Sequence, residues 1–441
     1  MEEKTGIFEK CIMSAILAAM AVFGVLFLLL PKKTFSENEN RNLARFPEWK
    51  TEELNGGVYT GKIEKYLADH FPGRDSWMMI ASEADRLGGK KEINGVYLAS
   101  DGRLIDIYQK PKQPERLINS VVRFADALPE TNIALMLVPT AQQVYQDLLP
   151  EYTPDNVYGR AEWQLDAIEE ILAAVEEETN GHVVTVNLAR GKGRGSGDDN
   201  STHWNLRNKW LWEDSFWDGF TDHEHTGEYY YRTDHHWTAW GAYRAYKTWW
   251  RETRQFAGWQ RRISAPPSRT DLYEAHLPTA DYVKENTPIS VVSKDFRGTT
   301  WSKLNDPFIA PDEIWSYWDE TWDLSVTFSD TGEVTDTPYG EEWLSKKDKY
   351  AYYLNGLHPL LIIENKAVPE EQGAIAVIKD SYGNSMIPYM ISDFRTIYVF
   401  DTRYWQQGVS SFVLEHEDIQ EVLILYSISM IDTDAGIGGI F

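Results

Sequence analysis

Cysteine is almost absent from this chain. Its 441 residues include a single cysteine, Cys11, which lies in an apolar segment near the N-terminus. No disulfide can form within one chain that has one thiol. The sequence therefore also excludes a cysteine nucleophile and a thiolate metal site from everything that follows this segment.

Positive charge is scarce as well. Lysine and arginine number 43 against 68 aspartate and glutamate residues, so the formal net charge is −25. Proteins bind nucleic acid by neutralising its phosphates with clustered Lys and Arg, and anionic lipid attracts the same side chains. The one basic cluster, residues 190–194, is interleaved with glycine and predicts a loop. We therefore expect no nucleic-acid partner and no docking driven by anionic lipid.

Only one apolar run is long enough to cross a membrane. Cys11–Leu30 contains twenty residues without a charge, and as a helix it would span roughly 30 Å, the thickness of the hydrocarbon core. Lys10 precedes the run, Pro-Lys-Lys at 31–33 ends it, and no small-x-small cleavage site follows. We expect residues 1–10 to be a short tail and residues 11–30 to be a retained transmembrane anchor.

The charges that flank this run leave its orientation open. More basic residues follow it than precede it, which by the positive-inside rule favours a cytoplasmic C-terminal flank, although long domains are translocated regardless of such a bias. The residues concerned are Lys4 and Lys10 before the run, and Lys32, Lys33, Arg41 and Arg45 after it.

The rest of the chain predicts an α/β fold. Residues 31–90 are polar with helical patches, which favours a stalk that packs on the main domain, residues 91–441. In that domain apolar runs alternate with amphipathic helical patterns, which predicts a parallel sheet flanked by helices. Loop-rich insertions are expected near 190–228 and 258–346. The predicted strands are 132–138, 182–188, 360–363, 374–379, 396–400 and 421–426, and the predicted helices include 117–128, 163–178 and 238–254.

One motif suited to acid–base chemistry is TDHHW at 233–237, between an aromatic run and a helical pattern. Asp234 lies two residues before His236, so its carboxylate can accept a hydrogen bond from one ring nitrogen and leave the other as a base. Taken alone, the motif fits equally well a helix-capping aspartate beside two partly exposed histidines.

A second motif follows about 145 residues later. The apolar run that begins at Ala374 leads into Lys-Asp-Ser-Tyr-Gly-Asn-Ser at 379–385, which predicts a strand, a turn at Ser381 and then a helix. A serine at such a turn is exposed, and the N–H groups of a helix start favour an oxyanion. An ordinary loop with a capping serine has a similar sequence, so the two motifs together are more specific than either alone.

Together these motifs resemble a known family. TDHHW at 233–237, KDSYGNS at 379–385 and DTRYW at 401–405 resemble the DHHW proteins, which are similar to the SGNH-like proteins that O-acetylate alginate and other bacterial exopolysaccharides. The resemblance extends over most of the chain. Shorter matches lie at 36–41, 69–74, 94–98, 138–140 and 348–350.

The resemblance implies an SGNH-hydrolase-like fold with a Ser-His-Asp triad. It assigns Ser381 as nucleophile, His236 as base and Asp234 as the orienting carboxylate. Trp237 is the last residue of the TDHHW motif, and His235 is expected to lie beside the triad and support it. The backbone N–H of Ser381 is one expected oxyanion donor.

This chain departs from the family pattern at two positions. Relatives have Gly-Asn-His-Pro where this chain has Gly-Leu-His-Pro starting at Gly356, and losing an oxyanion donor typically costs roughly 10²–10³ in rate. Asn355 and the Gly356 N–H are candidates to replace the asparagine that Leu357 displaces. Lys379 stands where many SGNH hydrolases have glycine. Arg403 is a candidate for holding a ligand, with a structural salt bridge as its alternative role.

The leading hypothesis is a single-pass membrane protein that transfers an acyl group, expected to be O-acetyl, to a cell-surface polysaccharide or hydrolyses it from one. The resemblance implies an extracytoplasmic main domain and, from the alginate system, a membrane-bound O-acyltransferase as partner. No cofactor is expected, because the sequence contains no glycine-rich phosphate loop.

Two alternatives remain. A catalytically weak or inactive glycan-binding or scaffold protein is favoured by Leu357 and by the eighteen tryptophans, whose indoles can stack on sugars. A metal-dependent hydrolase is favoured by a histidine cluster, since imidazoles beside carboxylates bind Zn²⁺ or Mn²⁺. Five of the ten histidines lie within 34 residues, namely His203, His223, His225, His235 and His236.

Overall fold

The computed structural model describes residues 2–36, 41–50, 57–151, 162–188, 229–254, 259 and 289–441. The chain forms two compact units, Met1–Asn94 with Trp301–Phe308, and Gly95–Thr300 with Ile309–Phe441. The predicted insertion near 190–228 and the part of the second insertion at 260–288 lie outside the described residues.

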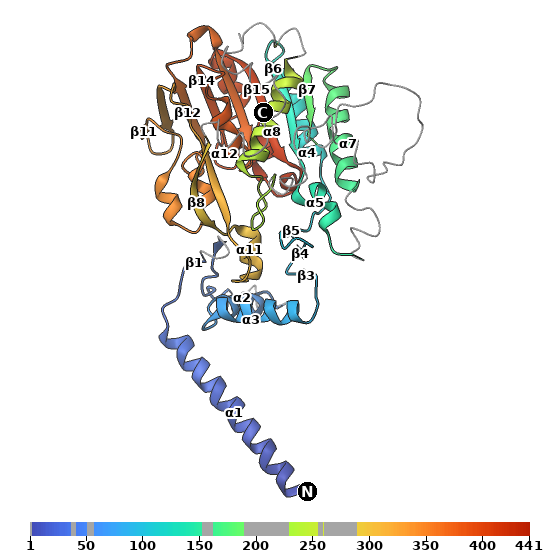
Figure 1. Ribbon diagram of the computed structural model, residues 1–441, viewed down its shortest axis with the longest axis vertical. Coiled ribbons are helices and arrows are strands. Elements are labelled where there is room, and N and C mark those ends of the chain that lie inside the picture. Colours follow the sequence, from blue (N-terminus) through green and yellow to red (C-terminus); the bar gives the residue numbers. More distant parts are fainter. Residues whose placement is uncertain are drawn as a thin grey trace, which may run out of the picture. The chain divides into compact units, whose positions relative to one another are not determined.

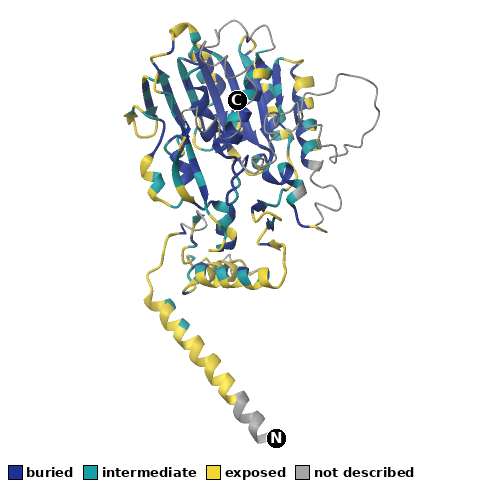
Figure 2. Cartoon of the chain, in the orientation of Figure 1, coloured by how far each residue is buried: buried dark blue, intermediate teal, exposed yellow. Residues whose placement is uncertain are grey.

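The first unit begins with α1 (Glu2–Leu29). Among the described residues, α1 is the one helix long and apolar enough to cross a membrane, with a mean hydropathy of 2.7 over Lys10–Leu29 and none of that window buried. Figure 2 shows it exposed over most of its described length. The other elements of this unit are β1 (Phe35–Ser36), β2 (Arg41–Asn42), α2 (Val58–Asp69), α3 (Arg74–Leu87) and β3 (Glu92–Ile93).

An eight-stranded sheet forms the centre of the second unit within the described residues (Figure 1), in the order β11-β10-β12-β14-β13-β15-β6-β7. The strands from β14 to β7 are parallel, and β12, β10 and β11 extend the sheet by antiparallel pairing. The α/β fold class is confirmed. The strands are β6 (Asn132–Val138), β7 (Val183–Asn187), β10 (Leu324–Phe328), β11 (Val334–Thr335), β12 (Leu360–Asn365), β13 (Ala374–Lys379), β14 (Thr396–Phe400) and β15 (Ile419–Ser427).

The two faces of this sheet enter two separate cores, which is why a central strand such as β13 is apolar throughout rather than alternating. In β13, Ile375 and Val377 enter the first core, while Ala376 and Ile378 enter the second. Helices cover both faces, as predicted. The first core contains side chains of α8 (Ala239–Thr253) and α12 (Gly383–Met386), and the second contains those of α4 (Glu115–Ala127), α7 (Glu162–Glu178) and α13 (Val409–Glu415).

Shorter elements complete the described chain. A hairpin is formed by β4 (Val96–Leu98) and β5 (Leu104–Asp106). Within the stretch expected to be a second insertion, β8 (Ile289–Phe296) pairs with β9 (Asp312–Tyr317), and β10 and β11 join the central sheet. The remaining α-helices of the described residues are α5 (Ala141–Val144) and α11 (Thr299–Leu304), and short 3₁₀ turns such as Lys349–Tyr352 lie between the elements.

Candidate active site

The strand β13 delivers Ser381 to the end of the sheet at a tight turn. The buried carboxylate of Asp380 holds this turn: one oxygen accepts the N–H of Tyr382 at 2.9 Å, and the other accepts the N–H of Ser427 at 2.7 Å. Burial raises the pKa of Asp380 to about 6. Ser381 itself is partly exposed and precedes α12.

A second segment brings the acid–base pair to this serine. Tyr230 and Trp237 pair across an isolated bridge, which folds the segment before α8 back on itself. His236 Nε2 lies 2.7 Å from Ser381 Oγ, and His236 Nδ1 lies 2.5 Å from Asp234 Oδ1. Both distances are those of hydrogen bonds, so the three side chains have the geometry of a Ser-His-Asp triad.

The pKa values of Asp234 and His236 are both shifted by their surroundings. Burial raises the pKa of Asp234, but the charges of His235 and His236 and the hydrogen bonds from His236 outweigh it and hold that pKa well below its usual range. Burial, helped by the charge of His235, lowers the pKa of His236 to about 4. The ring is therefore neutral near pH 7. Its Nδ1 carries the hydrogen toward Asp234, and its Nε2 offers a lone pair to Ser381.

Residues at the start of α11 hold Asp234 in place. The second carboxylate oxygen, Oδ2, accepts the Thr299 N–H at 2.7 Å and the Thr299 hydroxyl at 3.0 Å, while Oδ1 also accepts the His236 N–H at 3.0 Å. Gly298 packs so closely that a Cβ there would lie 2.1 Å from Asp234 Oδ2. The sequence predictions missed both Thr299 and Gly298, and the Arg-Gly-Thr-Thr pattern at 297–300 carries no recognisable signal beyond its glycine.

Tyr350 is a third residue that the predictions missed. Its ring stacks on His236, with centroids 3.9 Å apart and planes 10° apart. Its hydroxyl lies 3.1 Å from the carbonyl oxygen of Ser381 and 3.0 Å from Ser385 Oγ. Tyr350 therefore shields one face of the imidazole and braces the serine turn. Its only sequence signal is the short match at 348–350.

Trp237 and His235 occupy different environments. Trp237 is fully buried, and its indole N–H is 2.9 Å from both the Tyr382 carbonyl and Ser385 Oγ, so it ties the two motifs together from inside. The side chain of His235 remains 32% exposed, and its Nδ1 lies 2.7 Å from Thr299 Oγ1.

The candidate oxyanion turn has an unusual backbone. Leu354, Asn355 and Gly356 all have positive φ, at 58°, 54° and 103°. This conformation is costly for leucine, and such strain concentrates at functional sites. The side-chain oxygen of Asn355 accepts the Trp343 indole N–H at 3.0 Å, and Leu357 is exposed. Donation to an oxyanion by this turn stays a prediction.

Arg403 makes the salt bridge that the sequence offered as its alternative role. Its Nε and Nη2 approach the two carboxylate oxygens of Asp401 at 2.8 and 2.5 Å. Asp401 also lies 3.5 Å from the buried ammonium of Lys379, the last residue of β13. Ligand binding by Arg403 stays a prediction.

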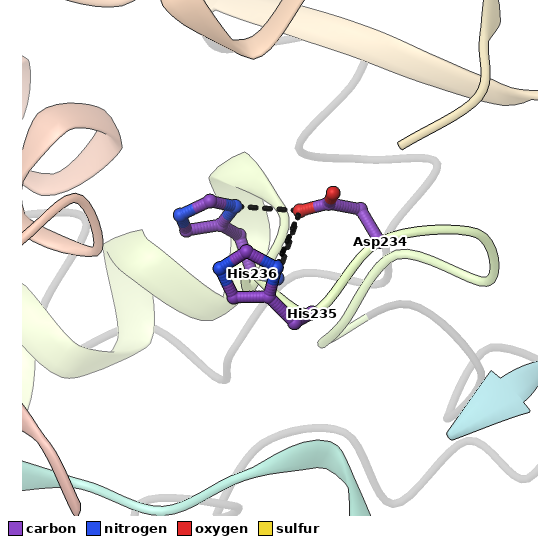
Figure 3. A group of neighbouring side chains, drawn as sticks. All are labelled: Asp234, His235 and His236. Atoms are coloured by element: carbon purple, nitrogen blue, oxygen red, sulfur yellow. Dashed lines mark hydrogen bonds and ion pairs between the residues drawn. The ribbon is translucent and has the colours of Figure 1, made fainter. Parts of the chain in front are cut away.

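Hydrogen bonds at this site compete with the binding of a metal ion. Asp234, His235 and His236 offer ligand atoms within 4.8 Å of one another, and Figure 3 shows both rings turned toward the carboxylate. However, both oxygens of Asp234 already accept hydrogen bonds from His236 and Thr299, which a metal ion would have to displace. The cluster's other members, His203, His223 and His225, lie outside the described residues.

Comparison with known proteins gives matches to solved structures. No family model and no curated protein sequence matches the chain. A DHHW family protein from Eubacterium siraeum superposes with a TM-score of 0.51 at 17% identity, covering 79% of this chain and 95% of that one. Bacillus cereus PatB1 superposes with TM-scores of 0.52 alone and 0.53 with a sulfonyl adduct, each at 17% identity, covering 78% of this chain and 99% and 97% of those. The predicted resemblance to DHHW proteins is thus confirmed at the level of the fold.

Proposed function

We propose that this chain is a membrane-anchored serine O-acyltransferase or esterase that acts on a cell-surface polysaccharide. The observation that carries the proposal is the unbroken hydrogen-bond relay from Ser381 through His236 to Asp234. A relay that ends on a partly exposed serine suits nucleophilic catalysis, because the base is already aligned with the hydroxyl proton.

In the first half-reaction His236 Nε2 takes the Ser381 proton while Oγ attacks the acyl carbonyl of the donor. The bond to the donor's leaving oxygen then breaks, His236 returns the proton to that oxygen, and an acyl-serine remains. In the second half-reaction His236 deprotonates a sugar hydroxyl, whose oxygen attacks the carbonyl of the acyl-serine. The bond between the acyl carbon and Ser381 Oγ then breaks, His236 returns the proton to Oγ, and the acylated sugar leaves. Water in place of the sugar gives hydrolysis. Asp234 keeps the imidazole in the required tautomer throughout.

Two groups are proposed to stabilise the tetrahedral intermediate. The Ser381 N–H lies at the start of the turn into α12, and the N–H of Gly356 belongs to the strained turn that follows Tyr350. Backbone donors fixed before the reaction stabilise an oxyanion without reorganisation. A donor at Gly356 would offset the absence of the family's asparagine at Leu357.

The cellular setting follows from α1 and from the family resemblance. We propose that α1 is a retained single-pass anchor and that the chain after it is extracytoplasmic, where a polysaccharide acceptor is found. The acyl donor would then come from a membrane-bound O-acyltransferase, the partner that the alginate-type resemblance implies.

A sulfonyl fluoride tests the nucleophile directly, since one protein of this fold forms a sulfonyl adduct. The purified full chain would be treated with the reagent, mapped by mass spectrometry and assayed on an aryl acetate. We expect modification of Ser381, and loss of both modification and turnover in Ser381→Ala. An exposed serine outside the site provides the control, Ser345→Ala, which should behave as wild type. Labelling elsewhere alone, or unchanged turnover in Ser381→Ala, would rule out acyl transfer at this site.

A further inference from the structure

The helix α3 exposes a row of apolar side chains on one of its faces. Trp77, Ile80, Ala84 and Leu87 follow each other at spacings of three and four residues and therefore share one helix face. All four are exposed, Trp77 at 47%, Ile80 at 52% and Leu87 at 84%, whereas Ser82 on the opposite face is buried at 3%. A helix on an aqueous surface has the reverse pattern.

This apolar face continues onto α1. Trp77 lies against Phe23 of α1, with ring centroids 5.9 Å apart, and Phe71 stacks on the same ring at 5.3 Å. One helical turn further along, Phe27 meets Tyr66 of α2 at 6.1 Å. Both phenylalanines belong to the apolar part of α1 that is long enough to cross a bilayer. The aromatic side chains around α3 are therefore in contact with the membrane-spanning segment itself.

The position of Phe23 sets the depth of these contacts. It lies six residues before the end of α1 at Leu29, which corresponds to about 9 Å of helix. Amphipathic helices in the membrane interface bury their apolar face by about 5–10 Å. With α1 spanning a bilayer, Phe71 and Trp77 fall at that depth.

We propose that α3 lies in the membrane interface beside α1 and inserts its exposed apolar face into the lipid. The inference rests on α1 spanning the membrane and is independent of the catalytic chemistry. A bilayer, rather than another protein, is the occupant because the face is continuous with α1. Residues 31–94 contain eleven basic and eleven acidic residues, so the insertion is driven by apolar burial and not by attraction to anionic lipid.

The chain's single cysteine makes this proposal directly testable. The full-length protein would be reconstituted in vesicles with an environment-sensitive fluorophore on native Cys11, or, in a Cys11→Ser background, on Ile80→Cys, Leu87→Cys or Lys90→Cys. Lys90 is 59% exposed in its side chain and follows α3, so it provides the water-facing control. Quenching would be compared between nitroxide lipids labelled in the upper acyl chain and iodide in the water. Circular dichroism would check that each variant keeps the wild-type fold.

Probes at Ile80 and Leu87 should be quenched by the nitroxide lipids and be severalfold less accessible to iodide than the probe at Lys90, equally in neutral and anionic vesicles. Iodide access equal to that at Lys90 would overturn the proposal, and so would shielding from both quenchers, because protein would then cover the face. A Cys11 probe outside the lipid would overturn the anchor and this proposal together. A Cys11 probe inside the lipid with α3 in water would overturn the proposal alone.

Discussion

Gly298 leaves the space that Asp234 occupies, and filling that space should disable the triad. A Cβ at position 298 would lie 2.1 Å from Asp234 Oδ2, 2.2 Å from its Cβ and 2.4 Å from its Cγ. Non-bonded carbon and oxygen atoms do not approach so closely, so in Gly298→Ala the carboxylate must move. It is held at 2.5 Å from His236 Nδ1 and at 2.7 Å from the Thr299 N–H. A displacement that relieves the clash therefore breaks at least one of these hydrogen bonds.

The size of the effect can be bounded from two sides. A misplacement of about 1 Å in a catalytic arrangement costs about 10²-fold in rate, and loss of the correct imidazole tautomer costs about 10⁴-fold. We therefore expect kcat/KM for Gly298→Ala to fall by about 10²–10⁴, or about 3–5 kcal/mol in the barrier. Overpacking a buried site costs typically about 1–3 kcal/mol in the free energy of unfolding. Activity should thus fall by more than stability does.

The assay combines ester hydrolysis with thermal melts of the full chain. The control is Gly438→Ala, because an added Cβ there meets no atom within 4 Å. A double variant separates the mechanism from general damage: adding Gly298→Ala to Asp234→Gly should reduce kcat/KM little further, since Asp234→Gly removes both the carboxylate and the Cβ that the new methyl group would meet. A kcat/KM for Gly298→Ala equal to that of Gly438→Ala, or an effect that simply adds to that of Asp234→Gly, would refute this role of Gly298.

Two further predictions concern the histidines. His236→Ala and Asp234→Ala should each nearly abolish turnover in folded protein, whereas His235→Ala should retain measurable activity. Steady-state kinetics and thermal melts on the three variants would measure this difference. An essential His235 with a dispensable His236 would contradict the assignment of His236 as the base. The base works only when neutral, and burial lowers the pKa of His236 to about 4, so kcat/KM should rise as pH increases through about 4 and then level off. An acidic limb centred near pH 7 in the measured profile would contradict this environment.

The sequence predicted the elements whose local pattern is strong. The strands at 132–138, 374–379 and 396–400 agree with β6, β13 and β14, because continuous apolar runs between turn residues are typical of strands buried on both faces. The helix expected from residue 238 is α8, and Thr238 caps it by accepting the Gly241 N–H at 3.3 Å. These features are encoded within a few neighbouring residues, which is why a pattern reveals them.

The supporting residues of the site could not be predicted in this way. Thr299 belongs to a stretch with no sustained apolar period, and Tyr350 lies in a short 3₁₀ turn whose tyrosines look alike in sequence. Only tertiary packing brings them to the triad, since Thr299 contacts a residue 65 positions earlier in the chain. The antiparallel strands β10 and β11 were missed because they are short: the alternation of apolar and polar residues in β10 ends after five residues, and β11 has only two residues.

The choice between the two adjacent histidines shows how such a distant residue decides the chemistry. Both imidazoles face Asp234, but His236 Nδ1 lies 2.5 Å from its Oδ1 and His235 Nδ1 lies 3.8 Å away. The Thr299 hydroxyl donates its only hydrogen to Asp234 Oδ2, so its oxygen must accept the hydrogen of His235 Nδ1. One carboxylate oxygen therefore orients His236 directly, while the other engages His235 only through Thr299. This arrangement supports the prediction that His236, at the Asp-x-His spacing, is the base, because Thr299 already holds the other imidazole.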